Sequence, residues 1–375
     1  MKRLADICDI QYGYAFDSKC FTEDSSYPQL VRIRDVKKGY SETYYSGDYP
    51  KEYILTEGDL LIGMDGEFNI ARWKCSGALL NQRVCKLTAK VGTNEEYLRF
   101  AMSKSLKEIE KRTAFVTVKH LSAKELNKLE LDVPELSKQD KIADTLSRLE
   151  RIIEAREEEL EKLDDLIKAR FVEMFGSIYD NKYGYNVMTL QDVCEPIKDG
   201  THQTPTYTED TVNGFKFLSS KDVTSGKVDW DHLKYIPEEL HNELYKRISP
   251  RKGDILLAKN GTTGVAAIVD RDEVFDIYVS LALLKPLEMV TAEYLCSAVN
   301  SLETKHQFDH SLKGIGVPNL HLGEIKKTKI IVPPIELQKQ FADFVHQVDK
   351  SKVVVQKALD ETQILFNSLM QQYFG

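Results

Sequence analysis

The chain has 375 residues, which is enough for two domains that each bury a core of their own. Its hydrophobic content of 42% is ordinary, and no apolar run approaches the roughly 18 residues that a membrane-spanning helix needs. Six cysteines without Cys-x-x-Cys spacing predict reduced thiols rather than a disulfide framework or a zinc site. Because the acidic Asp6 precedes any apolar core, we expect no signal peptide and a cytoplasmic protein without a membrane partner.

The net charge of −8 is unusual for a chain that binds nucleic acid, so its distribution matters. Residues 135–176 hold 12 acidic and 8 basic residues, and residues 335–375 hold 5 and 4. Most of the excess negative charge therefore lies in these two segments. A local basic face elsewhere is compatible with this distribution, although DNA binding by the chain alone is expected to be weak.

Residues 1–134 predict a mixed domain of short strands and few helices. Its clearest element is a hairpin in which the apolar run of residues 57–66 ends at Asp65-Gly66 and a second apolar stretch follows at residues 69–73. A tight Asp-Gly turn of this kind requires positive φ at both turn residues.

Residues 135–176 predict a long helix with apolar residues at heptad spacing. The heptad positions are Ile142, Leu149, Arg156, Leu163 and Arg170, and Leu146, Ile153, Leu160, Ile167 and Met174. A 3–4 spacing sustained over about five heptads favours a two-stranded coiled coil over a surface helix. At ~1.5 Å per residue, a helix of about 39 residues is roughly 58 Å long.

Residues 177–333 predict a second mixed domain, and residues 334–375 predict a second long helix. The second domain repeats the hairpin at residues 252–261, which end in Asn260-Gly261. The heptad positions of the second helix are Phe341, Val348, Val355, Thr362 and Leu369, and Val345, Lys352, Leu359, Phe366 and Tyr373.

The two halves of the chain are versions of one segment. Gln139 and Gln338 are 199 residues apart, as are Ala143 and Ala342. The second helix can reach the first only by running back along it. We therefore expect an α+β chain with a pseudo-two-fold internal repeat, in which two mixed α/β domains are separated by two long helices that form an antiparallel intramolecular coiled coil. Periodicity alone fits a plain spacer or a dimerisation rod equally well.

Between these landmarks the two domains diverge. Residues 12–19 of the first domain correspond to residues 199–205 of the second, and residues 33–36 correspond to residues 220–223, with different side chains. A common scaffold that displays two recognition surfaces would produce this pattern. Neutral drift after duplication would produce it too.

In their order and duplication, several short motifs resemble the specificity (S) subunit of type I restriction–modification systems over essentially the whole chain. They are residues 13–19 and 31–36, residues 199–205, the paired hairpins at Asp59 and Asp254, and the Pro-Pro segment at residues 332–338. The first copy of the last segment, residues 133–139, lacks the second proline but keeps the register.

The resemblance implies that each globular domain is a target recognition domain that reads one half of a bipartite, asymmetric site in double-stranded DNA. It implies that the coiled coil sets the spacing between the half-sites and docks two methyltransferase (M) subunits, with restriction/translocase (R) subunits joining the complex. The chain would confer specificity on the adenine methyltransferase and endonuclease subunits without catalysing either reaction.

Side chains that can read base edges in the major groove or contact phosphates mark the candidate DNA contacts. In the first domain they are Tyr14, Lys19, Arg32, Arg34, Lys37, Asp65, Glu67, Asn69, Arg83, Lys119 and His120. In the second domain they are His202, Gln203, Thr204, Lys221, Lys259, Asn260, Thr262, Thr263, Lys313 and Asn319. For each of them, a solvated loop residue or a turn former is an equally good interpretation.

The sequence carries no motif typical of an enzyme. Residues 332–335 lack the amide or acid before the prolines, and the aromatic after them, that an adenine methyltransferase needs. Asp65 and Glu67 lack the neighbouring lysine of a Mg²⁺-dependent nuclease. We therefore expect a non-catalytic chain with no cofactor and no metal. A stand-alone regulator that binds two DNA sites and a coiled-coil adaptor that touches no DNA stay open as alternatives.

Overall fold

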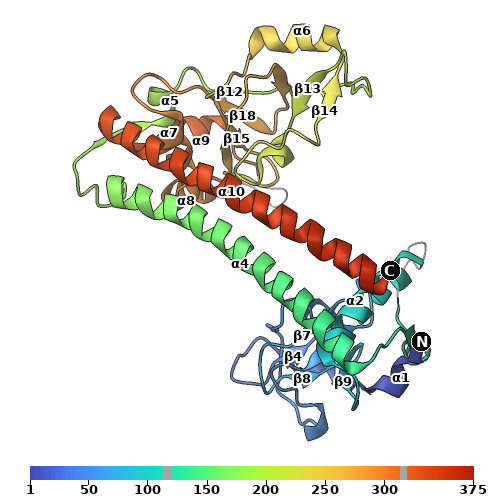
Figure 1. The fold of residues 1–375 in the computed structure, drawn as a ribbon. Coiled ribbons are helices and arrows are strands. Elements are labelled where there is room, and N and C mark those ends of the chain that lie inside the picture. The colour runs from blue at the N-terminus through green and yellow to red at the C-terminus, as the bar shows by residue number, and fades with distance from the viewer. Residues whose placement is uncertain (113–119, 313–318) are drawn as a thin grey trace. The chain divides into compact units, whose positions relative to one another are not determined.

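The computed structural model describes residues 1–112, 120–312 and 319–375. The chain divides into two compact units: unit 1 is Met1–Glu157 with Lys357–Gly375, and unit 2 is Glu158–Gln356. Each unit therefore contains one globular domain and part of both long helices, α4 (Leu136–Phe175) and α10 (Ile335–Phe374) (Figure 1).

Unit 1 is built on a four-stranded antiparallel sheet in the order β2-β9-β6-β7. Its strands are β2 (Cys8–Tyr12), β6 (Leu60–Gly63), β7 (Ile70–Arg72) and β9 (Val84–Ala89). Three two-stranded ladders pair β1 (Lys2–Arg3) with β10 (Glu130–Leu131), β3 (Phe21–Thr22) with β5 (Tyr44–Tyr45), and β4 (Leu30–Val31) with β8 (Leu79–Leu80). The helices of this domain are α1 (Leu4–Ile7), α2 (Glu95–Arg112) and α3 (Ala123–Lys128), with 3-10 turns η1 (Ser18–Cys20), η2 (Ile33–Asp35) and η3 (Lys51–Tyr53).

Unit 2 repeats this plan with the four-stranded antiparallel sheet β12-β18-β15-β16. Its strands are β12 (Lys198–Asp199), β15 (Ile255–Ala258), β16 (Ala266–Ile268) and β18 (Leu281–Leu284). A second sheet has the order β14 (Lys234–Ile236), β13 (Phe215–Leu218), β17 (Phe275–Ile277), and a ladder pairs β11 (Asn186–Thr189) with β19 (Lys329–Val332). The helices are α5 (Leu190–Val193), η4 (Ser220–Val223), α6 (Glu238–Arg247), α7 (Ala292–Val299), α8 (Leu302–Ser311) and α9 (Leu322–Lys327).

One inner strand of each four-stranded sheet, β6 or β15, is apolar on both faces. In β6, Leu60 and Ile62 belong to one buried cluster of unit 1 and Leu61 belongs to another. Strand β15 alternates between two clusters of unit 2 in the same way. A sheet covered on both faces needs continuous apolar runs rather than alternation, which explains the paired apolar segments of the sequence.

In unit 2, the end of α4 packs against the start of α10. The rings of Phe171 and Phe175 lie edge-to-face on Phe341, with centroid distances of 5.6 and 5.4 Å. All three side chains are buried in the largest cluster of this unit. The C-terminal end of α4 therefore contacts the N-terminal end of α10 in this unit.

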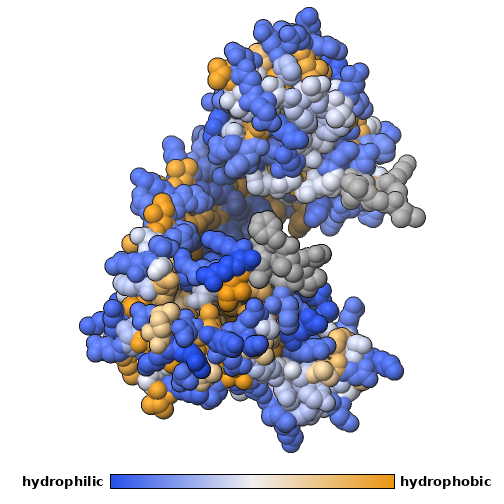
Figure 2. All heavy atoms as spheres, turned by 90° about the vertical axis from the view of Figure 1, so that its right-hand side faces the viewer, coloured by the Kyte–Doolittle hydropathy of each residue, from blue (hydrophilic) through white to orange (hydrophobic). Residues whose placement is uncertain are grey.

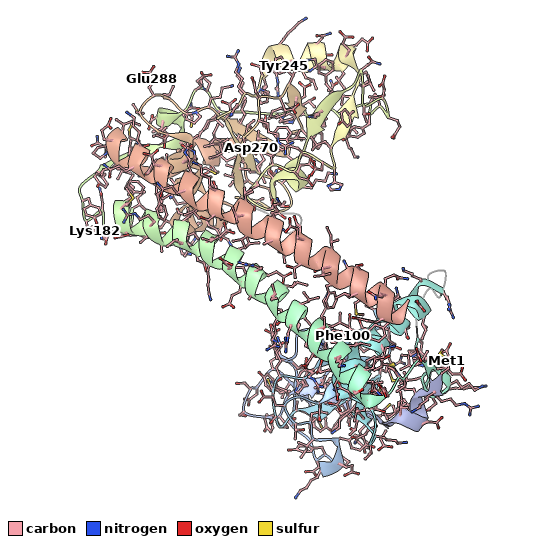
Figure 3. The ribbon with its side chains drawn as sticks, viewed as in Figure 1. Met1, Phe100, Lys182, Tyr245, Asp270 and Glu288 are labelled. Carbon is pink, nitrogen blue, oxygen red and sulfur yellow. The ribbon has the colours of Figure 1, made fainter. Side chains whose placement is uncertain are left out.

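In unit 1, the start of α4 packs with the end of α10. Ile142 and Leu146 are buried in one cluster with Phe366 and Met370 at its edge. Phe100, labelled on α2 in Figure 3, places its ring 6.1 Å from that of Phe366. Since opposite ends of the helices meet in each unit, the expected antiparallel pairing of α4 and α10 is confirmed (Figure 1).

Lys352 is the polar interruption in the heptads of α10, and it is buried. Its side chain is 9% exposed, and its ammonium group contacts the carboxylate of Asp164 on α4. Asp349, one turn earlier on α10, lies 3.6 Å away. The helix pair thus accommodates a charge at its seam by supplying an opposite charge from the facing helix.

A buried glutamine fastens each long helix to its globular domain. In unit 2, Gln338 accepts a hydrogen bond from the Thr291 N–H at 2.9 Å and donates to the carbonyls of Met289 and Pro333 at 3.0 and 2.9 Å. Gln139 makes the same set of three bonds in unit 1. Both side chains are fully buried, which accounts for the glutamine that the two halves of the sequence share.

The hairpin expected after β6 is present, but the prediction of its turn was wrong. Strands β6 and β7 pair antiparallel, yet residues 64–69 separate them instead of two turn residues. Positive φ is found at Gly66 (+71°) but not at Asp65, nor at Asn260 in unit 2. Asp65 and Asn260 instead form extended β-bridges with His120 and Asn319, which holds them out of the left-handed conformation.

Figure 2 shows hydrophilic side chains over most of the face it draws, with apolar side chains in small groups. Within the described ranges, no helix combines the length and the apolar character that crossing a membrane requires. All six cysteines are free thiols, and burial raises the pKa of Cys8 and Cys85 to about 12.

Candidate nucleic-acid interface

In each globular domain, four segments meet at the same edge of the four-stranded sheet. Two of them follow β2 and β6 in unit 1, or β12 and β15 in unit 2. The third precedes β9 or β18, and the fourth precedes the helix α3 or α9. Junction 1 comprises residues 13–14, 64–66, 81–83 and 120–121, and junction 2 comprises residues 200–202, 259–261, 278–280 and 319–320. Eight of the predicted DNA contacts lie in these segments. They are Tyr14, Asp65, Arg83 and His120 in junction 1, and His202, Lys259, Asn260 and Asn319 in junction 2.

Backbone hydrogen bonds join the segments in the same pattern in both junctions. In junction 1, the Met64 N–H donates to the Arg83 carbonyl at 2.8 Å, and the Leu121 N–H donates to the Met64 carbonyl at 2.7 Å. Junction 2 repeats both bonds at 2.9 and 2.7 Å, with Lys259 in the central place. The repeated scaffold therefore extends to the loops beyond the strands.

A glycine allows the first segment of each junction to enter. A Cβ atom on Gly13 would lie 1.9 Å from the Asn81 carbonyl oxygen, and one on Gly200 would lie 2.0 Å from the Ile277 carbonyl oxygen. Since any side chain would collide with backbone at these distances, glycine is required at both positions. The following residues, Tyr14 and Thr201, are thereby brought against the neighbouring segment.

Junction 1 contains a carboxylate held by two basic side chains. Asp65 is 14% exposed at its side chain; one oxygen contacts the guanidinium of Arg83, and the other lies 2.5 Å from His120 Nδ1. Burial alone raises the pKa of Asp65, but hydrogen bonds from His120 and Arg83 and their charges outweigh it. The pKa of this carboxyl therefore lies below its ordinary value.

Junction 2 is organised around a different carboxylate. Asp199 accepts from Lys259 at 3.1 Å, and His202 lies 3.4 Å from it. Arg247, at the end of α6, donates to the backbone carbonyls of Asp199 and Gly200 at 2.5 and 2.7 Å. The Lys259 side chain is only 8% exposed, so its geometry favours a supporting role; contact with DNA stays a prediction for this residue.

Three asparagine side chains at the junctions carry a shielded amide oxygen without a hydrogen-bond partner in the described part of the chain. They are Asn81, Asn260 and Asn319. Shielded acceptors without a partner are uncommon in folded proteins. Among the described residues, these three acceptors are therefore unpaired.

Tyr14 of junction 1 and the predicted contacts outside the junctions lie on loops and turns, where they are exposed or half-buried. Tyr14 is exposed and packs its ring against those of Phe16 and Tyr53, at 5.1 and 5.2 Å. The remaining ones are Lys19, Arg32, Arg34, Lys37, Glu67 and Asn69 in unit 1, and Gln203, Thr204, Lys221, Thr262 and Thr263 in unit 2. Lys119 and Lys313 lie outside the described residues.

Two residues that contact junction 2, Asp199 and Arg247, escaped the sequence analysis. Asp199 stands inside the motif at residues 199–205, but an acid next to a glycine gives no sign that it is buried against a lysine. Arg247 lies on α6, 47 residues from its partner Gly200, and no pattern in the sequence connects the two.

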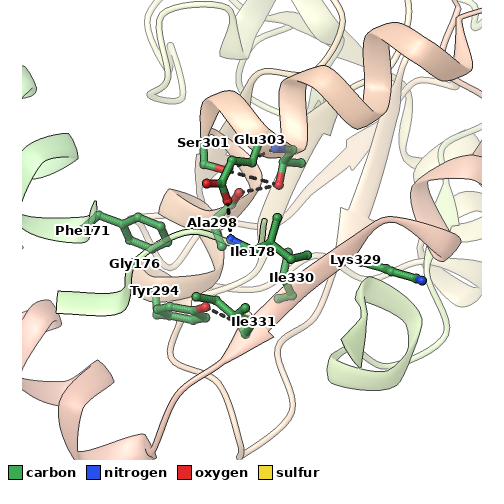
Figure 4. Close-up of a pocket in the computed structure, with 11 residues that line it drawn as sticks. Phe171, Gly176, Ile178, Tyr294, Ala298, Ser301, Glu303, Lys329, Ile330 and Ile331 are labelled. Atoms are coloured by element: carbon green, nitrogen blue, oxygen red, sulfur yellow. Dashed lines mark hydrogen bonds between the residues drawn. The ribbon is translucent and has the colours of Figure 1, made fainter. Parts of the chain in front are cut away.

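A small pocket of unit 2 lies away from junction 2, where the end of α4 meets α7, α8 and β19 (Figure 4). Its lining includes Phe171 and Tyr294, and the Ile178 N–H donates to Glu303 at 3.0 Å beside it. Its volume of about 10 Å³ is at the lower limit for one water molecule. This pocket is a packing feature of the helix end and not a ligand site. In the residues described, no group of three or more histidine, cysteine or acidic side chains is placed to hold a metal ion.

Comparison with known proteins covers both halves of the chain. A family model described as the type I restriction modification DNA specificity domain matches residues 1–164 and again residues 182–362. The EcoBI specificity subunit of Escherichia coli, a type I restriction enzyme subunit, is 29% identical over 393 residues, covering 98% of this chain and 83% of that protein. The MjaVIII specificity subunit of Methanocaldococcus jannaschii is 23% identical over 332 residues, covering 84% of this chain and 77% of that protein.

Solved structures share the fold. The type I restriction–modification S subunit from M. genitalium aligns with a TM-score of 0.58 at 15% identity, covering all of this chain and 95% of that one. A chain from a structure of type I system assembly and conformational transition aligns with a TM-score of 0.54 at 17% identity, covering all of this chain and 96% of that one.

Proposed function

Because the chain belongs to the family of type I restriction–modification DNA specificity subunits, we propose that its two globular domains each read one half of a bipartite DNA site. Residues 1–134 act as the first target recognition domain and residues 177–333 as the second. Junction 1 and junction 2, with the loops around them, approach the bases. The chain supplies recognition, and partner subunits supply the chemistry.

The observation that carries this proposal is that the two junctions share a pattern of backbone hydrogen bonds but carry unlike side chains. In junction 1 a carboxylate orients Arg83 and His120, whereas in junction 2 a carboxylate holds Lys259 and His202. Base edges are distinguished by the donors and acceptors that face them. Two scaffolds of one kind with different donors support two different half-sites, and hence an asymmetric site.

The helix pair α4 and α10 is proposed to set the spacing between the half-sites. Each helix has 40 residues and is therefore about 60 Å long, which exceeds one turn of DNA at ~34–36 Å. Reading half-sites one turn apart on a rod of this length requires the domains to lean inward or the DNA to bend.

The helices also offer surface for partner subunits. Large apolar side chains stay exposed on both of them: Ile152, Leu166 and Val172 on α4, and Val353, Val354, Ile364 and Leu365 on α10. These side chains lie outside the covered heptad positions, and we propose them as the surface that another protein binds. We propose two M subunits as these partners, with R subunits joining the complex. Their basic surfaces would offset the acidic character of the helices.

The experiment that tests the proposal lengthens both helices by one heptad. Seven residues are inserted after Glu157 in α4 and after Gln356 in α10, which are the boundaries between the two compact units. The insertion adds about 10 Å of helix, or roughly three base pairs at 3.4 Å each. We expect the complex with M subunits to methylate the same two half-sites across a spacer longer by about three base pairs.

Sequencing of methylated bases reads the outcome. A scrambled heptad of equal length with the apolar positions exchanged for polar ones is the matched control, and it should abolish methylation at any fixed spacing. Altered half-sites at the old spacing would contradict the proposal. Specific binding of a bipartite duplex by the chain alone, with no M subunit retained, would favour the stand-alone regulator instead.

A further inference from the structure

We propose that Arg83 reads a guanine in the first half-site and that Asp65 is the residue that positions it. This inference depends on the proposed function and adds a base and a residue to it. It is drawn from the backbone of Arg83, from the contacts of Asp65, and from the contrast with junction 2.

Arg83 has a backbone conformation that its side chain does not favour. Its φ is +67°, in the left-handed region that only about a few per cent of non-glycine residues adopt. Two backbone hydrogen bonds hold this turn: the Met64 N–H donates to the Arg83 carbonyl at 2.8 Å, and the Val84 N–H donates to the Asn81 carbonyl at 3.2 Å. Strained residues that the surroundings hold in place concentrate at functional sites.

The scaffold itself does not require this conformation. In junction 2, Ser280 occupies the equivalent place, and its carbonyl accepts the Lys259 N–H at 2.9 Å. Ser280 nevertheless has no positive φ, and it is 6% exposed. The left-handed backbone of junction 1 therefore goes together with the arginine that it presents, and not with the fold that the two domains share.

The side chain of Arg83 is presented outward from a fixed base. It is 54% exposed, whereas the Asp65 carboxylate that contacts its Nη1 is 14% exposed. The second oxygen of Asp65 lies against His120, so both oxygens are engaged within the protein. Because the Asp65 side chain is mostly buried and turned toward Arg83 and His120, it acts as a positioning residue.

Guanine is the base that this arrangement suits. A guanidinium donates two parallel hydrogen bonds to guanine O6 and N7 in the major groove, and no other base offers two acceptors in that geometry. The contact with the mostly buried carboxylate of Asp65 restricts the Arg83 guanidinium before DNA binds, so less side-chain entropy is lost on binding. Since Ser280 has no comparable pair of donors, this type of readout is assigned to the first half-site only.

The test uses the chain in complex with its M subunits and a duplex that carries the site this complex methylates. Each guanine of the first half-site is replaced in turn by 7-deazaguanine, which lacks the N7 acceptor. We expect one replacement to weaken binding by the unmodified chain on the order of 10-fold. The same replacement should leave binding by Arg83→Gly unchanged, because the acceptor then has no donor to lose.

Three further variants separate reading from folding. Glycine accommodates positive φ, so Arg83→Gly keeps the turn. Arg83→Lys keeps the charge but loses the two parallel N–H donors of the guanidinium, and it should bind DNA with little sensitivity to 7-deazaguanine. Asp65→Asn should weaken discrimination at the same guanine and nowhere else. Arg3→Lys, an exposed arginine on β1 of the same unit, is the control and should keep full discrimination.

The possible results test the assignment to Arg83, the positioning role of Asp65 and the proposed function separately. A first half-site without guanine, or an Arg83→Gly complex that still distinguishes guanine from 7-deazaguanine, overturns the assignment to Arg83 and leaves the proposed function standing. An Asp65→Asn complex that loses binding to all duplexes equally overturns the positioning role. A complex that methylates no bipartite site contradicts the proposed function itself, and this inference with it.

Discussion

Replacing Gln338 by methionine tests how the second long helix is fastened to its globular domain. The side chain is fully buried and makes hydrogen bonds of 2.9, 3.0 and 2.9 Å with one backbone N–H and two backbone carbonyls. Methionine has a similar size, so packing is largely kept while all three bonds are lost. The perturbation is therefore confined to polar groups at the junction of helix and domain.

The magnitude follows from the number of groups left without a partner. A buried N–H without an acceptor costs about 1–3 kcal/mol, and the two carbonyls add smaller amounts, so we expect a loss of about 3 kcal/mol. That is a large share of the roughly 5–15 kcal/mol that stabilises a typical domain. With an m-value of about 2 kcal/mol/M, the urea midpoint falls by about 1.5 M.

The two tryptophans allow the units to be followed separately. The chain contains two, Trp73 in unit 1 and Trp230 in unit 2, both buried. In a Trp73→Phe background, tryptophan emission therefore reports the unfolding of unit 2 alone. The substitution at Trp73 costs no hydrogen bond in the described part of the chain, because its indole N–H makes none there.

The matched control is Gln340→Met, the same substitution at an exposed position on the same helix. It should change the free energy of unfolding by less than about 0.5 kcal/mol. If Gln338→Met shifted the midpoint no more than Gln340→Met, the buried glutamine would not anchor the helix. Gln139→Met should lower the transition of unit 1 instead, measured in a Trp230→Phe background.

Three further results are expected. Lys352→Met should leave the urea midpoint of unit 2 unchanged or raise it. Removing a buried ammonium group ends its desolvation cost, while the mostly exposed Asp164 stays hydrated. A clear loss of stability would show that the ion pair itself stabilises the contact between the helices. The pKa of Asp65 is lowered in the folded chain, since hydrogen bonds from its histidine and arginine partners outweigh burial. The contribution of Asp65 to stability is therefore present above the ordinary pKa of 3.8 and lost as the pH falls below it. Asp65→Asn should make the urea midpoint of unit 1 fall less steeply between about pH 5 and 3. An unchanged pH dependence of this midpoint would contradict the pairing. Arg247→Met should relax methylation specificity at the second half-site only. The matched control Lys246→Met, at an exposed neighbouring position, should have no effect. Equal loss of methylation specificity at both half-sites would show that Arg247 acts on overall stability.

The architecture was predictable because it rests on short-range periodicity and on duplication. The heptad positions of residues 142–174 and 341–373 are buried or half-buried without exception, including Arg156 and Lys352. The direction of pairing followed from chain connectivity. What periodicity could not give is the acid that accompanies Lys352, because Asp164 lies outside the heptad series and 188 residues away.

The junctions were predictable in composition but not in contacts. Asp65, Arg83 and His120 were each selected for their chemistry, yet only the fold brings Asp65 to a partner 55 residues away. The turn at Asp65-Gly66 was misjudged because a local Asp-Gly preference was outweighed by the long-range bridge to His120. The strain at Arg83 leaves no trace in the sequence, since arginine has no intrinsic preference for positive φ.

The most direct measurement is the sequencing of methylated bases made by two complexes that differ in one domain. One contains the natural chain with its M subunits, and the other contains a chain whose residues 1–133 come from another member of the family. We predict methylation at bipartite sites that share the spacer and one half-site and differ in the other half-site. A change in both half-sites, or methylation at sites that are not bipartite, would contradict the account.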